Sequence, residues 1–429
     1  MKRRPAVTVL AMLGMVVLQA GCDGSPTDPA ANVSLSASPS VHADGSAGLA
    51  NLGEKIFNDR NLSIGKNQSC ASCHDPKFGF THPDTAVNGH GSVGEGSIAG
   101  RFAIRKAPSV AYSTFSPILA FNTEDEAWVG GSFWDGRASG ARLGSPAAEQ
   151  ALEPFVGPEE MALPDKACVV YRVAESRYAS LYRTAWGNAI FRIAFPPAPA
   201  MRSLCATEGS TVPLSAGDRQ QVLLEYDHIA LSIAAFEGSP KVNKFNSRFD
   251  AARTGGPRLT QEERAGLELY VGRAKCQLCH PIDGPRPLMT DFTYDNIGVP
   301  ANPENPAFLT RGFIDRGLGK ILRDEGLRGA QKVPTLRNID LRPTPFDAKA
   351  FMHNGAFKSL EQVVHFYNTR DVLPTCPAGV GPYDPRFGNT CWPAPEVAEN
   401  VNVDELGDLG LTPVEEAKLV RFLKTLSDR

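Results

Sequence analysis

Two short cysteine motifs carry the strongest chemical signal in the sequence. Both have the form Cys-x-x-Cys-His, and they comprise residues 70–74 and 276–280. Two thiols at this spacing can add across the two vinyl groups of one porphyrin, and the histidine that follows is then delivered to the iron. The sequence therefore predicts two covalently bound haem c groups. The predicted thioether cysteines and proximal histidine ligands are Cys70, Cys73, His74, Cys276, Cys279 and His280.

Two other interpretations fit paired cysteines. Four cysteines can hold a structural zinc ion, and a Cys-x-x-Cys pair can act as a thioredoxin-like redox centre. Neither interpretation explains why a histidine directly follows each pair. Because the same five-residue pattern occurs twice in one chain, haem attachment is the favoured prediction.

The other five of the nine cysteines bear on lipidation and disulfides. Cys22, at the end of the N-terminal segment, is assigned to a lipid. The remaining four are expected to pair, because disulfides form in oxidising compartments. Cys376 and Cys391 are close in sequence and flank a loop rich in proline and glycine, so we expect them to bond. Elimination then pairs Cys168 with Cys205.

The N-terminal segment has the features of an export signal. Basic residues at the start precede an apolar stretch, residues 7–18, that is too short to span a membrane. Residues 1–21 are therefore predicted to be a signal peptide, and the protein is expected in the periplasm. The residues before Cys22 resemble a lipoprotein cleavage site, although Gln19 stands where an aliphatic residue is usual. A lipidated Cys22 would tether the protein to a membrane, whereas cleavage after Ala20 would release it.

The composition is that of an ordinary globular protein of 429 residues with many loops. The formal net charge is −3, whereas nucleic-acid-binding proteins usually carry a basic surplus, so we predict no nucleic-acid partner. No apolar stretch after the N-terminus is long enough to span a bilayer. Residues 22–50 are rich in Ser, Ala, Asp, Pro and Gly, and are predicted to form a flexible tether.

The sequence after residue 50 repeats one order of motifs. An amphipathic helical pattern precedes each Cys-x-x-Cys-His motif. The related segments 106–110 and 332–336 come next, and then 133–136 and 351–355. This order predicts a mainly α-helical protein with two cytochrome-c-like haem domains packed against each other, long loops and little strand. The predicted domains comprise residues 51–255 and 256–429.

In these motifs the sequence resembles the bacterial di-haem cytochrome c peroxidase/MauG family. Besides both haem motifs, the resemblance rests on segments in the family's order, namely 89–91, 133–138, 333–338, 353–355 and 363–364. It implies that H₂O₂ reacts at the N-terminal haem, and that the C-terminal haem relays electrons or stores oxidising equivalents. The implied electron donor is a small cytochrome c or a cupredoxin. Alternatively, the protein would oxidise side chains of a partner protein.

The resemblance also implies residues of the N-terminal haem site. Glu160 matches the distal acid, which takes a proton from one peroxide oxygen and gives it to the other. Gln150 matches a distal polar residue. Trp134 matches an aromatic residue between the two haems, where it would carry electrons or holes. A buried core tryptophan is the alternative for Trp134.

A second histidine ligand on the N-terminal haem is implied for peroxidases of the family. His90 lies sixteen residues after His74, the spacing at which the family places this removable ligand. An exposed loop histidine is the alternative, and His82 is the better candidate for that role. The resemblance therefore indicates His90 as a haem ligand.

The sixth ligand of the C-terminal haem separates two branches of the family. Peroxidases place a methionine fourteen residues after the histidine that His353 matches, and MauG-like proteins place a tyrosine there. Tyr367 stands at this distance from His353, whereas Met352 does not. The resemblance thus favours a MauG-like protein with Tyr367 on the iron, and a core tyrosine is the alternative. A phenolate favours ferric and higher states, whereas a thioether favours ferrous iron.

Calcium and catalysis each have an open alternative. The family often binds calcium between the haems through an asparagine and backbone carbonyls, but Lys106 stands where the asparagine would be. An ammonium could replace the charge of the ion but could not bind it, so calcium is in doubt.

A non-enzymatic electron carrier is the rival interpretation. Glu160 favours an enzyme, because a carrier needs no distal acid.

Overall fold

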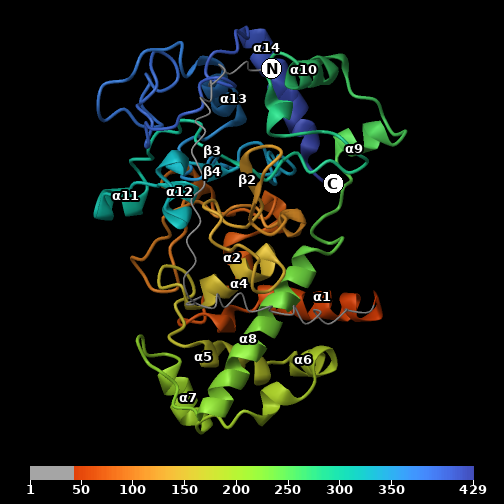
Figure 1. Ribbon diagram of the computed structural model, residues 1–429, viewed down its shortest axis with the longest axis vertical. Coiled ribbons are helices and arrows are strands. Elements are labelled where there is room, and N and C mark those ends of the chain that lie inside the picture. The colour runs from red at the N-terminus through yellow and green to blue at the C-terminus, as the bar shows by residue number, and fades with distance from the viewer. Residues whose placement is uncertain (1–42) are drawn as a thin grey trace, which may run out of the picture. The chain divides into compact units, whose positions relative to one another are not determined.

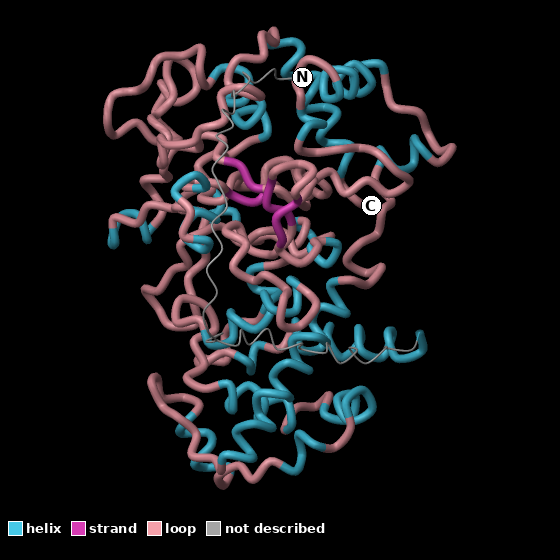
Figure 2. The backbone as a smooth tube through the Cα atoms, viewed as in Figure 1, coloured by secondary structure: helices cyan, strands magenta, loops and turns pink. Residues whose placement is uncertain are grey.

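The computed structural model describes residues 43–429, and short helices joined by long loops dominate it (Figures 1 and 2). The helices up to residue 237 are α1 (Ala43–Phe57), α2 (Cys70–Cys73), α3 (Thr85–Gly89), α4 (Pro146–Val156), α5 (Lys166–Ala174), α6 (Ala179–Trp186), α7 (Ala198–Leu204) and α8 (Ala216–Glu237). The later helices are α9 (Arg248–Arg253), α10 (Gln261–Val271), α11 (Pro306–Arg311), α12 (Gly317–Leu322), α13 (Leu360–Thr369) and α14 (Pro413–Leu423). The mainly helical class is thus confirmed.

Strand is confined to two short antiparallel pairs within the described residues (Figure 2). The first pair joins β1 (Ala120–Asn122) to β2 (Ala127–Val129), with Phe121 opposite Trp128. The second joins β3 (Tyr294–Asp295) to β4 (Gln331–Lys332). Among residues 43–429, no helix is long and apolar enough to cross a membrane.

Buried apolar side chains form two cores inside one compact unit. The first core extends from Leu52 to Val242, and the second from Phe249 to Leu426. The second core therefore begins upstream of the predicted domain boundary between residues 255 and 256, and that boundary stays a prediction. Each core contains one of the two Cys-x-x-Cys-His motifs at its edge, because Cys70 packs against the first core and Cys276 against the second.

Both predicted disulfides are confirmed. Cys168 of α5 is bonded to Cys205, which follows α7 in the first core. Cys376 is bonded to Cys391 and closes a loop of the second core. The four cysteines of the haem motifs are free.

The N-terminal predictions fall mostly on residues 1–42, which lie outside the described part of the chain. The signal peptide, the lipidated Cys22 and most of the tether therefore stay predictions. One correction concerns the end of the tether. Helix α1 begins at Ala43, so residues 43–50 are helical and not a flexible segment. Leu49 and Leu52 of this helix are buried, which explains why the apolar face of α1 extends upstream of residue 51.

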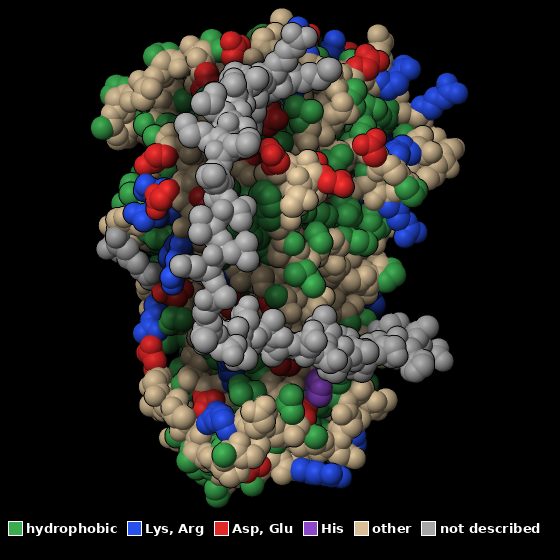
Figure 3. Space-filling model, in the orientation of Figure 1, with side chains coloured by type: hydrophobic (Ala, Val, Ile, Leu, Met, Phe, Trp, Pro, Cys, Tyr) green, Lys and Arg blue, Asp and Glu red, His purple; other side chains and the backbone are tan. Residues whose placement is uncertain are grey.

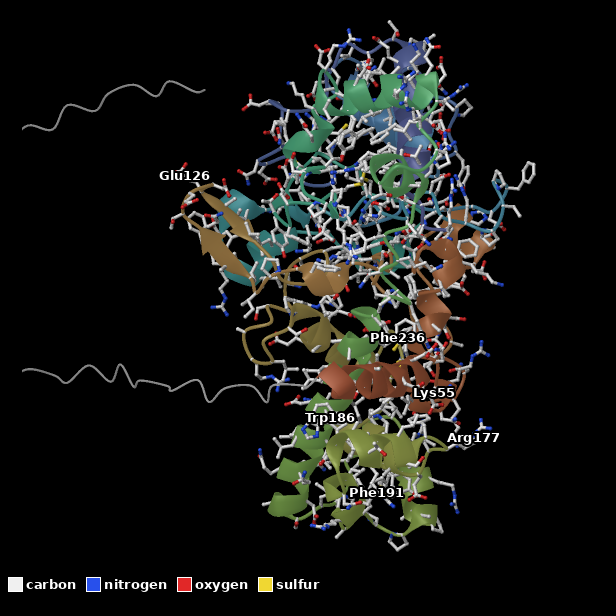
Figure 4. All side chains as sticks on the ribbon, turned by 90° about the vertical axis from the view of Figure 1, so that its right-hand side faces the viewer. Lys55, Glu126, Arg177, Trp186, Phe191 and Phe236 are labelled. Atoms are coloured by element: carbon white, nitrogen blue, oxygen red, sulfur yellow. A yellow bond between two sulfur atoms is a disulfide. The ribbon has the colours of Figure 1, made fainter. Side chains whose placement is uncertain are left out.

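A glycine marks the closest helix contact in each half. Helix α1 crosses α8 at Gly53, where a Cβ atom would collide with the Ser232 carbonyl. Phe236 packs on Phe57 beside this crossing, with 5.2 Å between the ring centroids (Figure 4). In the second half, α10 crosses α14 at Gly266, where a Cβ atom would collide with the backbone of α14. The repeated glycine thus lets the helix that precedes each Cys-x-x-Cys-His motif pack closely in both halves.

Substitution at this crossing should lower stability. Gly53→Ala forces α1 away from α8, and we expect a loss of about 1–3 kcal/mol, the usual cost of overpacking. Thermal denaturation followed by circular dichroism measures the effect. Gly48→Ala is the matched control, because Gly48 lies on the same helix with open space around it. Its midpoint should be unchanged or higher, since alanine favours the helix. Equal midpoints for both variants would contradict the close crossing.

Candidate active site

The first Cys-x-x-Cys-His motif presents a neutral, oriented imidazole. Cys70 and Cys73 are the first and last residues of helix α2, and His74 follows directly. The Nδ1 atom of His74 lies 3.0 Å from the Phe80 carbonyl oxygen. Because a carbonyl only accepts, Nδ1 carries the proton, and Nε2 keeps its lone pair for a metal. Burial lowers the pKa of His74 to about 4, so the ring is neutral at physiological pH.

The second motif repeats this arrangement. The Nδ1 atom of His280 lies 2.9 Å from the Met289 carbonyl oxygen, and burial lowers the pKa of His280. The two accepting residues share a left-handed backbone, with φ of 59° at Phe80 and 55° at Met289. In both halves, therefore, a backbone carbonyl accepts from Nδ1 of the histidine and leaves Nε2 free.

The cysteines fit two separate haem groups better than one zinc ion. A Cys₄ zinc site requires four thiolates that converge. Burial raises the pKa of Cys73, Cys276 and Cys279 to about 12, which disfavours the thiolates that zinc binds. Over residues 43–429, no group of three or more Cys, His, Asp or Glu side chains is arranged to hold a metal ion. The residues present thus suit porphyrins attached at two places.

Trp134 and His353 lie where the two halves meet. Each follows a residue with a left-handed backbone, Phe133 (φ 65°) or Met352 (φ 66°). The Trp134 and His353 rings are in edge-to-face contact, with centroids 6.4 Å apart. The indole N–H of Trp134 donates to the Lys106 carbonyl at 2.9 Å, which fixes the ring in this position.

Two backbone hydrogen bonds cross the same contact in opposite directions. The Lys106 N–H donates to the His353 carbonyl, and the Lys332 N–H donates to the Trp134 carbonyl, each at 2.8 Å. These four residues belong to the motifs that the sequence repeats. The repeat is thus also structural, because each half donates one of these backbone hydrogen bonds and accepts the other.

One cavity extends from Trp134 to the second haem motif. Its lining includes Gln150 from α4 and Tyr367 from α13, together with Cys276, Cys279 and His280. Burial raises the pKa of Tyr367, and its proximity to Cys279 and Cys276 raises it further. Met352 lines the same cavity, so the cavity alone does not decide whether Tyr367 or Met352 would bind the iron. Tyr367 as the sixth ligand stays a prediction.

Glu160 lies close to the first haem motif. Glu160 is half-buried. Burial raises the pKa of Glu160 to about 7, although Arg137 opposes the shift. Burial raises the pKa of Cys73, and the charge of Glu160 raises it further, so the carboxylate acts on this motif electrostatically. An acid of this pKa can both take and return a proton near neutral pH.

The structure does not bring the predicted ligand His90 to this site. The His90 side chain is 73% exposed, and its Nδ1 atom lies 3.6 Å from the Glu304 carboxylate. His82 was expected to be an exposed loop histidine. It is buried instead, so that prediction is wrong. The loop folds inward at His82 because Asn88 donates to the His82 carbonyl and the Asp84 N–H donates to the His82 ring.

Lys358 holds the His90 loop against the second half. Its ammonium donates to the carbonyl oxygens of Asn88, His90 and Gly355 at 3.1, 2.5 and 2.8 Å, and to the Ser92 hydroxyl at 2.8 Å. Four bonds to one cation fix the backbone on both sides of His90. This contact explains why the imidazole points outward in the structure.

The profile of the di-haem cytochrome c peroxidase family matches residues 47–257. The methylamine utilization protein MauG of Paracoccus denitrificans is 31% identical over 410 residues, which cover 94% of this chain and 92% of that protein. The chain belongs to the di-haem cytochrome c peroxidase/MauG family. It is accordingly a haem peroxidase by family, with haem c as the cofactor that the family implies.

Other members of the family cover most of the chain. Cytochrome c551 peroxidase of Nitrosomonas europaea is 29% identical over 321 residues, which cover 74% of this chain and 72% of that protein. The crystal structure of the diheme peroxidase BthA from Burkholderia thailandensis superposes with a TM-score of 0.69 at 29% identity, covering 89% of this chain and 86% of that one. A MauG-like protein associated with microbial copper homeostasis gives a TM-score of 0.59 at 26% identity, with coverage of 89% and 90%.

Three features near this family's haem motifs were missed from the sequence. Arg105 forms a buried network, in which it donates twice to Asp315, at 2.5 and 2.7 Å, and once to Asp135, at 2.6 Å. The position of Arg105, directly before a repeated motif, could have indicated it. Lys349 and Lys358, by contrast, were missed because each reaches the first half through distant partners, namely Phe78 for Lys349 and the His90 loop for Lys358.

The position of His90 can be tested by spectroscopy. Since His90 points to solvent, His90→Ala should leave the electron paramagnetic resonance spectrum of the ferric holoprotein unchanged. The wild-type N-terminal haem should already give a high-spin signal, typical of an iron without a second strong ligand. A low-spin signal that turns high-spin in His90→Ala would show that His90 binds the iron at rest.

Proposed function

We propose that the protein is a periplasmic, MauG-like di-haem peroxidase that reduces H₂O₂ at its N-terminal haem site. Both haems would be covalently attached, through Cys70 and Cys73 and through Cys276 and Cys279. When bound, haem supplies the iron that exchanges electrons with peroxide and retains oxidising equivalents. His74 and His280 would hold the two irons. The observation that carries the proposal is Glu160, a half-buried acid near the first haem motif whose pKa is raised to about 7 by burial.

The role proposed for Glu160 follows from the proton balance. Reduction of H₂O₂ to two water molecules consumes two electrons and two protons. A base must take the proton of one peroxide oxygen, and an acid must protonate the other as the bond between them breaks. Glu160 can do both in turn. Gly157 leaves room for its carboxyl group, since a Cβ atom there would lie only 2.7 Å from Oε2 of Glu160.

Electrons or holes would pass between the two haems through Trp134. The indole is buried, contacts His353 of the second half and lines the cavity of the second haem motif. Gln150, on the same cavity wall, would contribute a polar side chain near Trp134. Tyr367 would bind the second iron. Burial disfavours a free phenolate there, but the charge of a ferric ion reverses this preference.

A protein partner would complete the reaction, either as an electron donor such as a small cytochrome c or cupredoxin, or as a substrate whose side chains are oxidised. Large apolar side chains are exposed around the β1–β2 hairpin, namely those of Phe115 (45%), Ile118 (44%) and Phe121 (48%). Figure 3 shows apolar side chains gathered near the middle of one face, with acidic and basic groups interspersed around them. Such exposed apolar groups support contact with a protein.

The proposed location rests on residues 1–21 and on the disulfides. The two disulfide bonds suit an oxidising compartment such as the periplasm. Lipidation of Cys22 would hold the protein at a membrane surface. A non-enzymatic electron carrier is the second candidate, and Glu160 favours the enzyme over it.

Glu160→Gln tests the proposal directly. The amide keeps the size of the side chain but cannot take the proton, so the reaction of the holoprotein with H₂O₂ should slow by about 10²–10⁴-fold. In the wild type the rate should rise with pH through about 7, as Glu160 loses its proton, and the variant should lose this dependence. Stopped-flow absorbance measures both. Glu159→Gln is the matched control and should react as the wild type does. Unchanged kinetics in Glu160→Gln would favour the electron carrier.

Tyr367→His tests the assignment to the MauG-like branch. Neutral imidazole should preserve a six-coordinate haem but donate less charge than phenolate, so oxidising equivalents should be lost sooner after H₂O₂ is added. Absorbance spectra before and after peroxide measure this lifetime. Identical spectra for variant and wild type would remove Tyr367 from the iron. A methionine–iron charge-transfer band in the wild type would instead point to Met352.

A further inference from the structure

Two lysine side chains are buried where the halves meet. Lys106 is 7% exposed and Lys349 is 3% exposed. Burying an ammonium without compensation costs several kcal/mol. Among the residues that the structure describes, neither ammonium forms an ion pair with a carboxylate, and the nearest acid to Lys349, Asp340, is paired with Arg342 at 2.5 Å. The two cations therefore need another explanation.

Backbone oxygen atoms surround the Lys349 ammonium. It donates to the carbonyl oxygens of Phe78, Leu341 and Asn338 at 2.8, 2.9 and 3.1 Å. Phe78 follows the first haem motif, whereas the other two belong to the second half, so this one cation joins both. Gly79 permits the approach, since a Cβ atom there would lie 2.9 Å from the Asn338 carbonyl. A shell of carbonyl oxygens is what a hard cation selects, and here the chain's own ammonium fills it.

Lys106 places a second cation in the same space. Its backbone is fixed on both sides, because its N–H donates to His353 and its carbonyl accepts from Trp134. Its ammonium has one long hydrogen bond, 3.3 Å, to the Ala107 carbonyl. Burial lowers the pKa of Lys349, and the charge of Lys106 lowers it further. Both line the cavity beside Trp134.

We infer that Lys106 supplies the cation of the space between the haems, that the amine of Lys349 occupies the shell of carbonyl oxygens there, and that no calcium ion binds. The donor set does not fit calcium. A lysine stands at the position of the expected asparagine, and the carbonyl oxygens of Phe78, Asn338 and Leu341 are bound to Lys349. This inference goes beyond the proposed function and holds whether or not H₂O₂ is the substrate.

Calcium content tests the first half of the inference. The holoprotein is incubated with excess CaCl₂, desalted, and analysed for calcium by mass spectrometry against its haem content. We expect far less than one calcium per chain, and no effect of EGTA on the thermal midpoint or on the ferric spectra. One retained calcium per chain, or a shift of either readout with EGTA, would overturn the inference.

Substitution of Lys106 tests the second half. Lys106→Met keeps both backbone hydrogen bonds but removes the charge. A nearby cation favours the reduced haem, so both midpoint potentials should shift to more negative values in redox titrations. Lys106→Arg keeps the charge and should restore the wild-type potentials, and Lys320→Met, on the exposed surface of α12, should leave them unchanged. Wild-type potentials in Lys106→Met would overturn the role of the cation. If that variant fails to fold, Lys106→Gln compared with Lys106→Arg decides the same question.

Discussion

The reciprocal contact between the two repeats positions both haem motifs relative to each other. Lys106 donates to the turn that carries His353, and Lys332 donates to the turn that carries Trp134, so each half holds the other in the same way. The edge-to-face contact of Trp134 and His353 lies between these two bonds. Because the same turns and segments flank the cavity of the second haem motif, a change in this contact would alter the electron path and the cavity together.

Burial sets the chemistry of the groups around this contact, with opposite effects on acids and bases. It raises the pKa of Glu160 to about 7, which suits an acid that exchanges protons, and lowers the pKa of His74 to about 4, which keeps a metal-binding ring neutral. The same effect lowers the pKa of Lys349, whose amine donates to three carbonyl oxygens. One physical cause thus acts on a proton-transfer group, a ligand and a buried amine.

The sequence allowed prediction wherever chemistry depends on local spacing. The Cys-x-x-Cys-His motifs, the repeated segments, the helical class and both disulfides are of this kind. Prediction was limited where long-range contacts decide a side chain's position. The His90 side chain is exposed and its carbonyl is bound by Lys358, which lies 268 residues away in the sequence, so its role as a ligand stays a prediction. Helix α1 extends into the predicted tether because Leu49 reaches the core. Neither contact leaves a pattern in neighbouring residues, whereas His82 is buried through hydrogen bonds with Asp84 and Asn88 of its own loop.

The proposed coupling of the two haem sites through Trp134 can be measured by stopped-flow spectroscopy of Trp134→Phe after mixing the ferric holoprotein with H₂O₂, with Trp128→Phe on the β1–β2 hairpin as the matched control. We expect an unchanged rate of the first reaction with peroxide, but a slower spectral response of the haem at the second Cys-x-x-Cys-His motif. Trp128→Phe should respond as the wild type does. Wild-type rates for both haems in Trp134→Phe would show that Trp134 does not couple the two sites.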